Sequence, residues 1–390
     1  MVVNHLYYND AQPAGTPSQS FSFSPKLLQQ ALQNIYGPSF DPEKDIEPTF
    51  WQTFTKAFNQ AADQGFSQSS YNPSQAFTSA LRHSNAVFAA FKTHRLQNDL
   101  AQLLTDSNGN LKPFQQWKKD ILPIASHQCQ HWLQTEYDTA VIRAHQAADW
   151  QQFQAEKDVL PNLRWVPSTS PNPGADHLPF WNTVLPVDHP FWDQHRPGDR
   201  WNCKCSLSAT DDPATSVPTV PASSAGGNRP HPGLDTNPGK TAQLFSDTHP
   251  YIKNAYPGAK EAVEKAVKKA EKKIIKQELR KAVQGQSITS PQFPHQILVS
   301  RASIDEWVNQ PFKYMKEKAQ MLFNIQNIIR QAEYVGTSDK KGGKIVQSHI
   351  FKTKVKDIDA YIIVQEFVDG KFILHSISDA QDFMKYVKIK

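Results

Sequence analysis

The sequence predicts a multidomain protein with a mainly α-helical N-terminal domain and a small C-terminal α+β domain that contains an antiparallel sheet. At 390 residues the chain exceeds the roughly 150 residues of a usual domain, so one continuous core is not expected. Apolar residues recur at helical spacing through residues 25–153, whereas β-rich runs with a period of two appear only after residue 345. These patterns divide the chain into an N-terminal domain (1–210), a Pro/Ser/Gly linker (211–248), a Lys-rich amphipathic helix (249–284) and a C-terminal domain (285–390).

The charge follows the same division. The net charge of +5 is made up of −5 over residues 1–248, +6 over 249–284 and +4 over 285–390. A polyanionic partner is therefore expected to bind the C-terminal third.

The sequence predicts that the protein is synthesised in a cytosol. No stretch approaches the roughly 18 apolar residues of a membrane span. The N-terminus also lacks the basic segment followed by an apolar one that marks secretion. The three cysteines, two of them in Cys203-Lys204-Cys205, are too few for a disulfide scaffold and fit a reducing compartment or a metal site.

The N-terminal domain begins with helices and ends in an irregular segment. Apolar spacings of three and four predict helices over residues 25–36, 50–65, 76–104 and 129–153. Eight prolines between Pro161 and Pro197 then exclude helix through most of this stretch. Since the same stretch is rich in Trp and Phe, we expect a Pro/Trp-rich cap folded onto the helices, with indole N–H groups donating to backbone carbonyls.

Residues 211–248 are rich in Pro, Gly, Ser and Thr and are predicted to be an unpacked linker. The Lys-rich helix that follows could neutralise nucleic-acid phosphates. Its interspersed Glu residues and lack of aromatics favour a weakly packed spacer instead.

The C-terminal domain is predicted to start with a helix that Pro311 interrupts and that resumes over 312–332. Strands are expected over 345–352, 360–367 and 371–377, joined as an antiparallel meander with a hairpin turn at Asp369-Gly370. His295 is assigned to a loop.

The cap carries the most specific motif of the chain. A run from His177 through two Phe-Trp pairs leads to Trp201-Asn202-Cys203-Lys204-Cys205. This run resembles the C-terminal signature of the phage Mu F-like head morphogenesis proteins, over roughly residues 50–210. The resemblance implies a minor capsid protein located in the virion, with phage portal and capsid proteins as partners.

The same motif has the residue types of a zinc site, because thiolates and imidazoles are the ligands that zinc prefers. Cys203 and Cys205, with His189, His195 and the nearby His177, are the candidate ligands. The spacing is not that of a zinc finger, so packing of two small buried thiols is the favoured interpretation over a structural zinc.

The C-terminal domain is similar to the barnase/EndoU/colicin E5-D/RelE-like nucleases that end some phage head proteins. The resemblance implies a metal-independent RNase, with RNA as substrate, no catalytic cofactor and an immunity protein as a partner.

Metal-independent RNA cleavage needs a base, an acid and a cation. We assign the acid to His375 and the base to Glu366 or His349. Lys352 or Lys354 would stabilise the charged phosphate, and Ser376 and Ser378 could donate hydrogen bonds to it. Alternation in the strand places His349 and Lys352 on opposite faces, and each of these side chains also has an ordinary structural interpretation, such as edge protection.

The leading hypothesis is thus a phage or prophage minor head protein that carries a tethered RNase-like effector. The competing hypothesis is a purely structural protein whose C-terminal domain is a non-catalytic contact module for capsid or nucleic acid.

Overall fold

The computed structural model describes residues 23–173, 176–219, 229–339, 343–380, 385 and 387–389. The chain divides into two compact units, Met1–Val267 and Lys268–Lys390. None of the helices in these ranges has the length and apolar character of a membrane span. The predicted organisation, helical first and α+β second, is confirmed.

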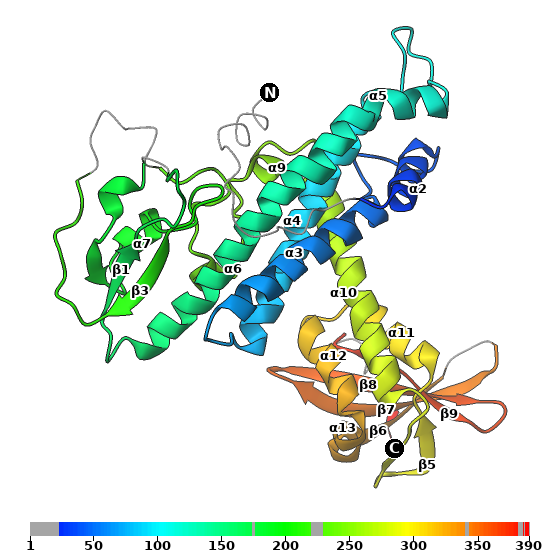
Figure 1. The fold of residues 1–390 in the computed structure, drawn as a ribbon. Helices are drawn as coiled ribbons and strands as arrows, with labels where there is room; N and C mark the ends of the chain where they lie inside the picture. Colours follow the sequence, from blue (N-terminus) through cyan, green and yellow to red (C-terminus); the bar gives the residue numbers. More distant parts are fainter. Residues whose placement is uncertain are drawn as a thin grey trace. The chain divides into compact units, whose positions relative to one another are not determined.

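Unit 1 is built on helices that pack side by side (Figure 1) and bury their apolar residues in one core. They are α2 (Pro25–Tyr36), α3 (Pro48–Gln68), α4 (Gln75–Ala101), α5 (Phe114–Ser126), the π-helix η1 (His127–Trp132) and α6 (Leu133–Glu156). Helix α3 packs against α4 and α6. A Cβ at Gly65 would lie 2.4 Å from the Val141 carbonyl oxygen, so glycine permits the close approach of α3 and α6.

Helix α5 and the π-helix are absent from the prediction. Pro123 lies inside α5, and a proline in a helical pattern normally argues against helix because it removes a donor. The π-helix follows directly after this turn, where the i→i−4 ladder is already disturbed. The chain thus stays helical through a position where sequence rules predict a break.

The predicted cap contains a small sheet as well as irregular backbone. Strands β1 (Asn162–Val166), β2 (Val184–Pro186) and β3 (Ser206–Thr210) form an antiparallel sheet in the order β2-β1-β3. The short helices η2 (Leu178–Phe180) and α7 (Phe191–Gln194) lie beside it. Its core holds the buried rings of Trp165, Phe180 and Trp192, and the Trp192 indole donates to the Pro186 carbonyl at 2.9 Å. The expected indole-to-carbonyl hydrogen bond is thus present at Trp192 but not at Trp181, whose buried Nε1 has no hydrogen-bond partner in the described part of the chain.

The predicted linker is wrong for residues 229–248. Leu234, Leu244 and Phe245 are buried in the core of unit 1, and α8 (Pro238–Thr241) packs against α6. Few apolar residues mark this segment, and its packing depends on hydrogen bonds to carbonyls that composition does not reveal. Helix α9 (Pro250–Lys253) continues the packed segment.

The Lys-rich helix is confirmed as a helix, α10 (Ala259–Val283), but it is not weakly packed. In unit 1 its residues Ala259, Val263 and Val267 are buried. In unit 2, Leu279 and Val283 are buried in the second core. Each half of the apolar stripe therefore belongs to a different core.

Unit 2 has a seven-stranded sheet in the order β10-β6-β7-β8-β9-β5-β4 among the described residues. The strands are β4 (Ser287–Ser290), β5 (Phe293–Leu298), β6 (Glu333–Asp339), β7 (Ile345–Val355), β8 (Ile358–Phe367), β9 (Phe372–Ser378) and β10 (Lys388–Ile389). The predicted meander is β7-β8-β9, extended by β6. The β4–β5 hairpin joins the edge of β9 through a parallel pair, which the purely antiparallel prediction missed.

Three helices cover one face of this sheet (Figure 1): α11 (Arg301–Asn309), α12 (Met315–Phe323) and α13 (Ile325–Gln331). The Ser300 hydroxyl accepts from the Ser303 amide at 3.0 Å and thereby caps α11. The break between α11 and α12 agrees with the interruption expected at Pro311. The break at Asn324 between α12 and α13 was not predicted and divides the single helix expected over 312–332.

Phe245→Ala tests whether the second half of the predicted linker is core. The Phe245 ring stacks on Phe88 at 4.3 Å between centroids, so its loss should lower the free energy of unfolding by about 3–5 kcal/mol. The matched control is Val217→Ala, in the first half of the same predicted linker, where the side chain is 49% exposed; we expect a change within about 0.5 kcal/mol. Equal effects of the two substitutions in chemical denaturation would contradict the assignment.

Candidate functional sites

The first site lies in the cap, where three chain segments meet. His177 immediately precedes η2, and Cys203 and Cys205 immediately precede β3. Residues 196–200 form the buried turn between them. Gly198 has φ +79° in this turn, a left-handed conformation that favours glycine because a Cβ would be strained there. The turn lies beside the Gln146 side chain of α6, whose oxygen is 2.6 Å from the position of such a Cβ.

The three side chains converge through their metal-binding atoms. The Cys203 Sγ lies 3.5 Å from the His177 Nδ1, and the Cys205 Sγ lies 3.8 Å from the same nitrogen. All three ligand atoms lie within 4.8 Å of one another, and all three residues are buried.

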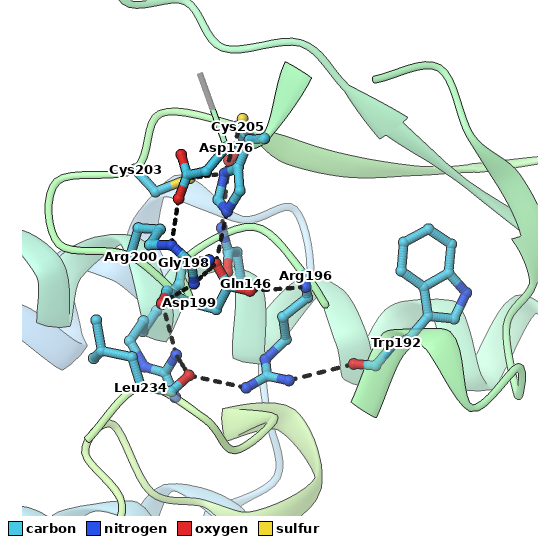
Figure 2. Close-up of polar contacts among 12 residues, drawn as sticks. Gln146, Asp176, Trp192, Arg196, Gly198, Asp199, Arg200, Cys203, Cys205 and Leu234 are labelled. Atoms are coloured by element: carbon cyan, nitrogen blue, oxygen red, sulfur yellow. Dashed lines mark hydrogen bonds and ion pairs between the residues drawn. The ribbon is translucent and has the colours of Figure 1, made fainter. Parts of the chain in front are cut away.

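A carboxylate holds the other side of the imidazole. The His177 Nε2 lies 2.7 Å from the Asp199 Oδ1, and Asp199 is fully buried. Arg200 contacts both Asp199 and Asp176 (Figure 2). The aspartate thus fixes the orientation of the ring whose Nδ1 faces the two sulfurs.

The contacts within the site shift the pKa values of its own residues. Burial lowers the pKa of His177, but the hydrogen bonds with Asp199 and Cys205 outweigh it and raise that pKa to about 9. The hydrogen bond from Cys203 lowers the pKa of Cys205 despite burial, and His177 lowers it further. The Cys203–Cys205 hydrogen bond, together with burial, raises the pKa of Cys203. Thiolate character is therefore stabilised at Cys205.

The other two predicted ligands lie outside this cluster. The His189 Nδ1 accepts from the Phe191 amide at 3.1 Å, at the start of α7. The His195 ring packs on Phe180 at 4.8 Å between centroids. The structure thus brings Cys203 and Cys205 together with His177 and not with His189 or His195.

The second site lies on the sheet of unit 2 and contains two predicted catalytic residues. The His349 Nε2 lies 3.0 Å from the Glu366 Oε2, and the Tyr334 hydroxyl lies 3.0 Å from the His349 Nδ1. Gln347 donates to the Glu366 Oε2 at 2.7 Å. The register pairs Gln347 with Glu366 and His349 with Val364, which places these side chains on one face.

Strand β5 adds a histidine that the sequence analysis placed in a loop. The exposed His295 ring stacks on Phe372, with centroids 4.1 Å apart and planes at 13°. The neighbouring Phe293 contacts the His349 ring at 4.7 Å. Because β5 pairs with β9 in parallel, His295 reaches the end of the sheet where β9 begins. We name His295, His349 and Glu366 the His-Glu cluster.

The neighbours of Glu366 in this cluster change the pKa of its carboxyl group. The hydrogen bond from Gln347 lowers the pKa of Glu366, and the hydrogen bond with His349 and the charges of His349 and His295 lower it further, although burial opposes them. A carboxylate that is 24% exposed and surrounded in this way is ionised at neutral pH.

The remaining predicted catalytic residues lie elsewhere on the sheet. No register shift falls between His349 and Lys352 in β7, so these residues face opposite sides as expected. Lys352 forms an ion pair with Asp359 at 2.8 Å, and Lys354 is also paired in register with Asp359. Neither lysine shares a face with the His-Glu cluster.

Strand β9 likewise separates His375 from the cluster. The register with β8 shifts at this point, pairing Leu374 with Val364 and Ser376 with Ile363, so His375 is the extra residue of a bulge. Ser376 is fully buried, and the Ser378 hydroxyl accepts from the Ala380 amide at 3.2 Å. The structure does not unite His375, Ser376 or Ser378 with His349 and Glu366.

Sequence reasoning missed His295, Tyr334 and Gln347 as members of the second site. Alternation along β7 alone predicts that Gln347 shares a face with His349. His295 joins the site because β5 pairs with β9, which is distant in sequence. Tyr334 joins it because β6 pairs with β7 across a shift in register between Tyr334 and Gly336. Neither pairing could be predicted from the local sequence pattern.

Comparison with known proteins gives two family matches on separate parts of the chain. Residues 96–208 match the family described as Phage Mu protein F like protein. Residues 266–374 match Large polyvalent protein-associated domain 3. No curated protein and no solved structure matches this chain.

The matches support a phage Mu F-like head protein. The first match contains His177, Cys203 and Cys205, so the cap site lies within the Mu F-like part. The second contains the His-Glu cluster. The chain therefore combines a segment similar to the Mu F-like family with a segment similar to Large polyvalent protein-associated domain 3, and neither description names a nuclease.

Glu366→Gln tests the electrostatics of the second site. Because the pKa of Glu366 in the folded protein lies below its ordinary value of 4.5, the carboxylate adds stability above pH 4.5 and loses this contribution as the pH falls through the folded-state pKa. The wild-type protein should therefore exceed the variant in stability at pH 6, and the difference should shrink toward pH 3 in denaturation curves. The control Glu333→Gln removes an exposed carboxylate from β6; a wild-type advantage over Glu366→Gln that does not change with pH would refute the assignment.

Proposed function

We propose that this chain is a minor head protein of a phage or prophage, bound near the portal in the virion, whose C-terminal unit is a metal-independent RNase. The Mu F-like match supports the head protein. The single observation that carries the RNase proposal is the His-Glu cluster, in which an ionised carboxylate, a buried histidine and an exposed histidine gather on one rigid sheet.

The cluster contains the groups that the reaction needs. Glu366 is the base: it removes the proton from a ribose 2′-OH as that oxygen attacks phosphorus. His295, exposed on β5, is the acid: it protonates the 5′-oxygen as the P–O5′ bond breaks. The products are a 2′,3′-cyclic phosphate and a 5′-hydroxyl, because the 2′-oxygen and not water attacks phosphorus.

His349 is a positioning residue in this mechanism. It is held between the Tyr334 hydroxyl and the Glu366 carboxylate, and it is only 6% exposed. Its imidazolium form would also supply positive charge near the phosphate. Lys352 and Lys354, the residues predicted for this role, lie on the other face of the sheet. The positive charge near the phosphate is therefore assigned to His349.

The surroundings favour an RNA base as ligand. The His295 and Phe372 rings form a partly exposed stacked pair at the edge of the site, and stacking on aromatic rings is how proteins bind unpaired bases without sequence preference. An immunity protein that covered this face would protect the cell that makes the protein.

The test uses the full chain, because Leu279 and Val283 of α10 belong to the core of unit 2 and a fragment starting at residue 285 would remove them. In EDTA, the purified protein should cleave a fluorescent oligoribonucleotide to a 2′,3′-cyclic phosphate with a bell-shaped pH profile. The matched substrate is the same strand with 2′-O-methyl groups, which lacks the nucleophile and should remain intact.

Substitutions test the roles proposed for Glu366 as the base and His295 as the acid. Glu366→Gln and His295→Gln should each reduce cleavage by about 10²–10⁴-fold, with one limb of the pH profile lost in each. His375→Gln, on the β9 bulge, is the control and should retain activity. If His375→Gln abolishes cleavage and His295→Gln does not, the acid is on the other face and this arrangement is wrong. If the wild-type protein leaves RNA intact at every pH, the non-catalytic contact module takes its place.

A further inference from the structure

We propose that His177, Cys203 and Cys205 bind a zinc ion that ties together the cap of the Mu F-like part. The ligand atoms are the His177 Nδ1 and the two thiolate sulfurs. This proposal is independent of the RNase proposal, because it concerns another unit of the chain and other chemistry.

The spacing of the three atoms fits a common metal ion. With Zn–S bonds of about 2.3 Å, Zn–N bonds of about 2.0–2.1 Å and tetrahedral angles, a nitrogen and a sulfur on one zinc ion are about 3.6 Å apart. The two observed Nδ1–Sγ distances are 3.5 and 3.8 Å. Both nitrogen–sulfur distances therefore match those of a shared zinc ion, and the three donor atoms all lie within 4.8 Å of one another.

Hydrogen bonding alone explains this arrangement less well. An imidazole Nδ1 takes part in one in-plane hydrogen bond, whether as donor or as acceptor, yet both sulfurs face the same nitrogen. Two thiols buried as small apolar groups would pack against carbon rather than share one ring atom. A cation at the common point uses all three donors at once.

The environment of the histidine is that of a metal ligand. Asp199 lies 2.7 Å from the Nε2. A carboxylate in this position keeps the proton on Nε2, so zinc would displace only the proton of Nδ1 and bind its lone pair. Arg200 and the Arg196 backbone amide hold Asp199 in turn. The carboxylate is fully buried, so these protein groups take the place of solvent around it.

Charge balance also favours a divalent ion. Two thiolates neutralise Zn²⁺, and the filled site adds no net charge to a region that already holds the buried Arg196 and Arg200. Three ligands leave the fourth tetrahedral position to water. The ion would connect the segment before η2 to the segment before β3, and its binding energy would stabilise the folded cap.

The experiment measures metal in the full chain purified without chelator. Elemental analysis should give about one zinc per chain. Replacement by Co²⁺ should give the sulfur-to-cobalt absorption of a thiolate site. Cys203→Ser and Cys205→Ser should each lose the metal, and Asp199→Asn should weaken zinc binding by about 10–100-fold.

Cys129→Ser is the matched control, since Cys129 is also buried and free but lies in η1, outside the cluster. It should retain the metal. Because a ligand variant could also fail to fold, the wild-type protein gives a second measurement: a strong chelator should lower its Tm, and added Zn²⁺ but not Mg²⁺ should restore it.

Three outcomes would overturn the proposal. One is a protein that holds no metal after incubation with Zn²⁺ and desalting, with a Tm that a chelator does not change. Another is equal metal loss from Cys129→Ser. The third is a Cys203–Cys205 disulfide, detected by mass spectrometry, in protein prepared with reductant.

Discussion

The fold of the N-terminal unit depends on the burial of one guanidinium group. Arg143 of α6 is fully buried, and it donates to the carbonyls of Gly198, Leu234, Thr236 and Leu244 at 2.6–3.1 Å. A buried cation is tolerated only when its donors are satisfied, and hydrogen bonds to a charged group are the strong ones. Arg143 therefore fixes both the cap turn and residues 234–244 on α6, although neither has a large apolar face of its own.

This constraint extends to the proposed zinc site. Arg143 holds the carbonyl of Gly198, and the next residue, Asp199, orients the His177 ring. Arg196 donates to the same Leu234 carbonyl at 3.1 Å and so joins the turn to the packed segment from the other side. The position of the imidazole is thus set by a helix residue far away in the sequence. The hydrogen bonds of Arg143 and Arg196 are therefore connected, through the turn that holds Asp199, to the cluster of His177, Cys203 and Cys205.

The second unit shows how strand pairing selects a site from several candidates. Side chains alternate between the two faces of a sheet, so one shift in register changes the face to which a residue belongs. The regular stretch of β7 keeps His349 away from Lys352 and Lys354, and the bulge at His375 separates that residue from Glu366. The parallel pairing of β5 with β9 brings in His295 instead.

The sequence by itself determined the elements whose cause is local. Apolar spacing predicted most of the helices and the strands of the central meander, alternation separated His349 from Lys352, and the motif from His177 to Cys205 identified the Mu F-like part. Only the tertiary structure decided the rest, because its causes are contacts between distant residues. The composition of the segment around Leu234 and Phe245 predicts a linker. Its packing depends on the hydrogen bonds that Arg143 donates to the Leu234 and Leu244 carbonyls, which the sequence pattern does not show. Likewise, His177 rather than His189 or His195 joins the two cysteines, because the buried turn at residues 196–200 brings Asp199 against the His177 ring.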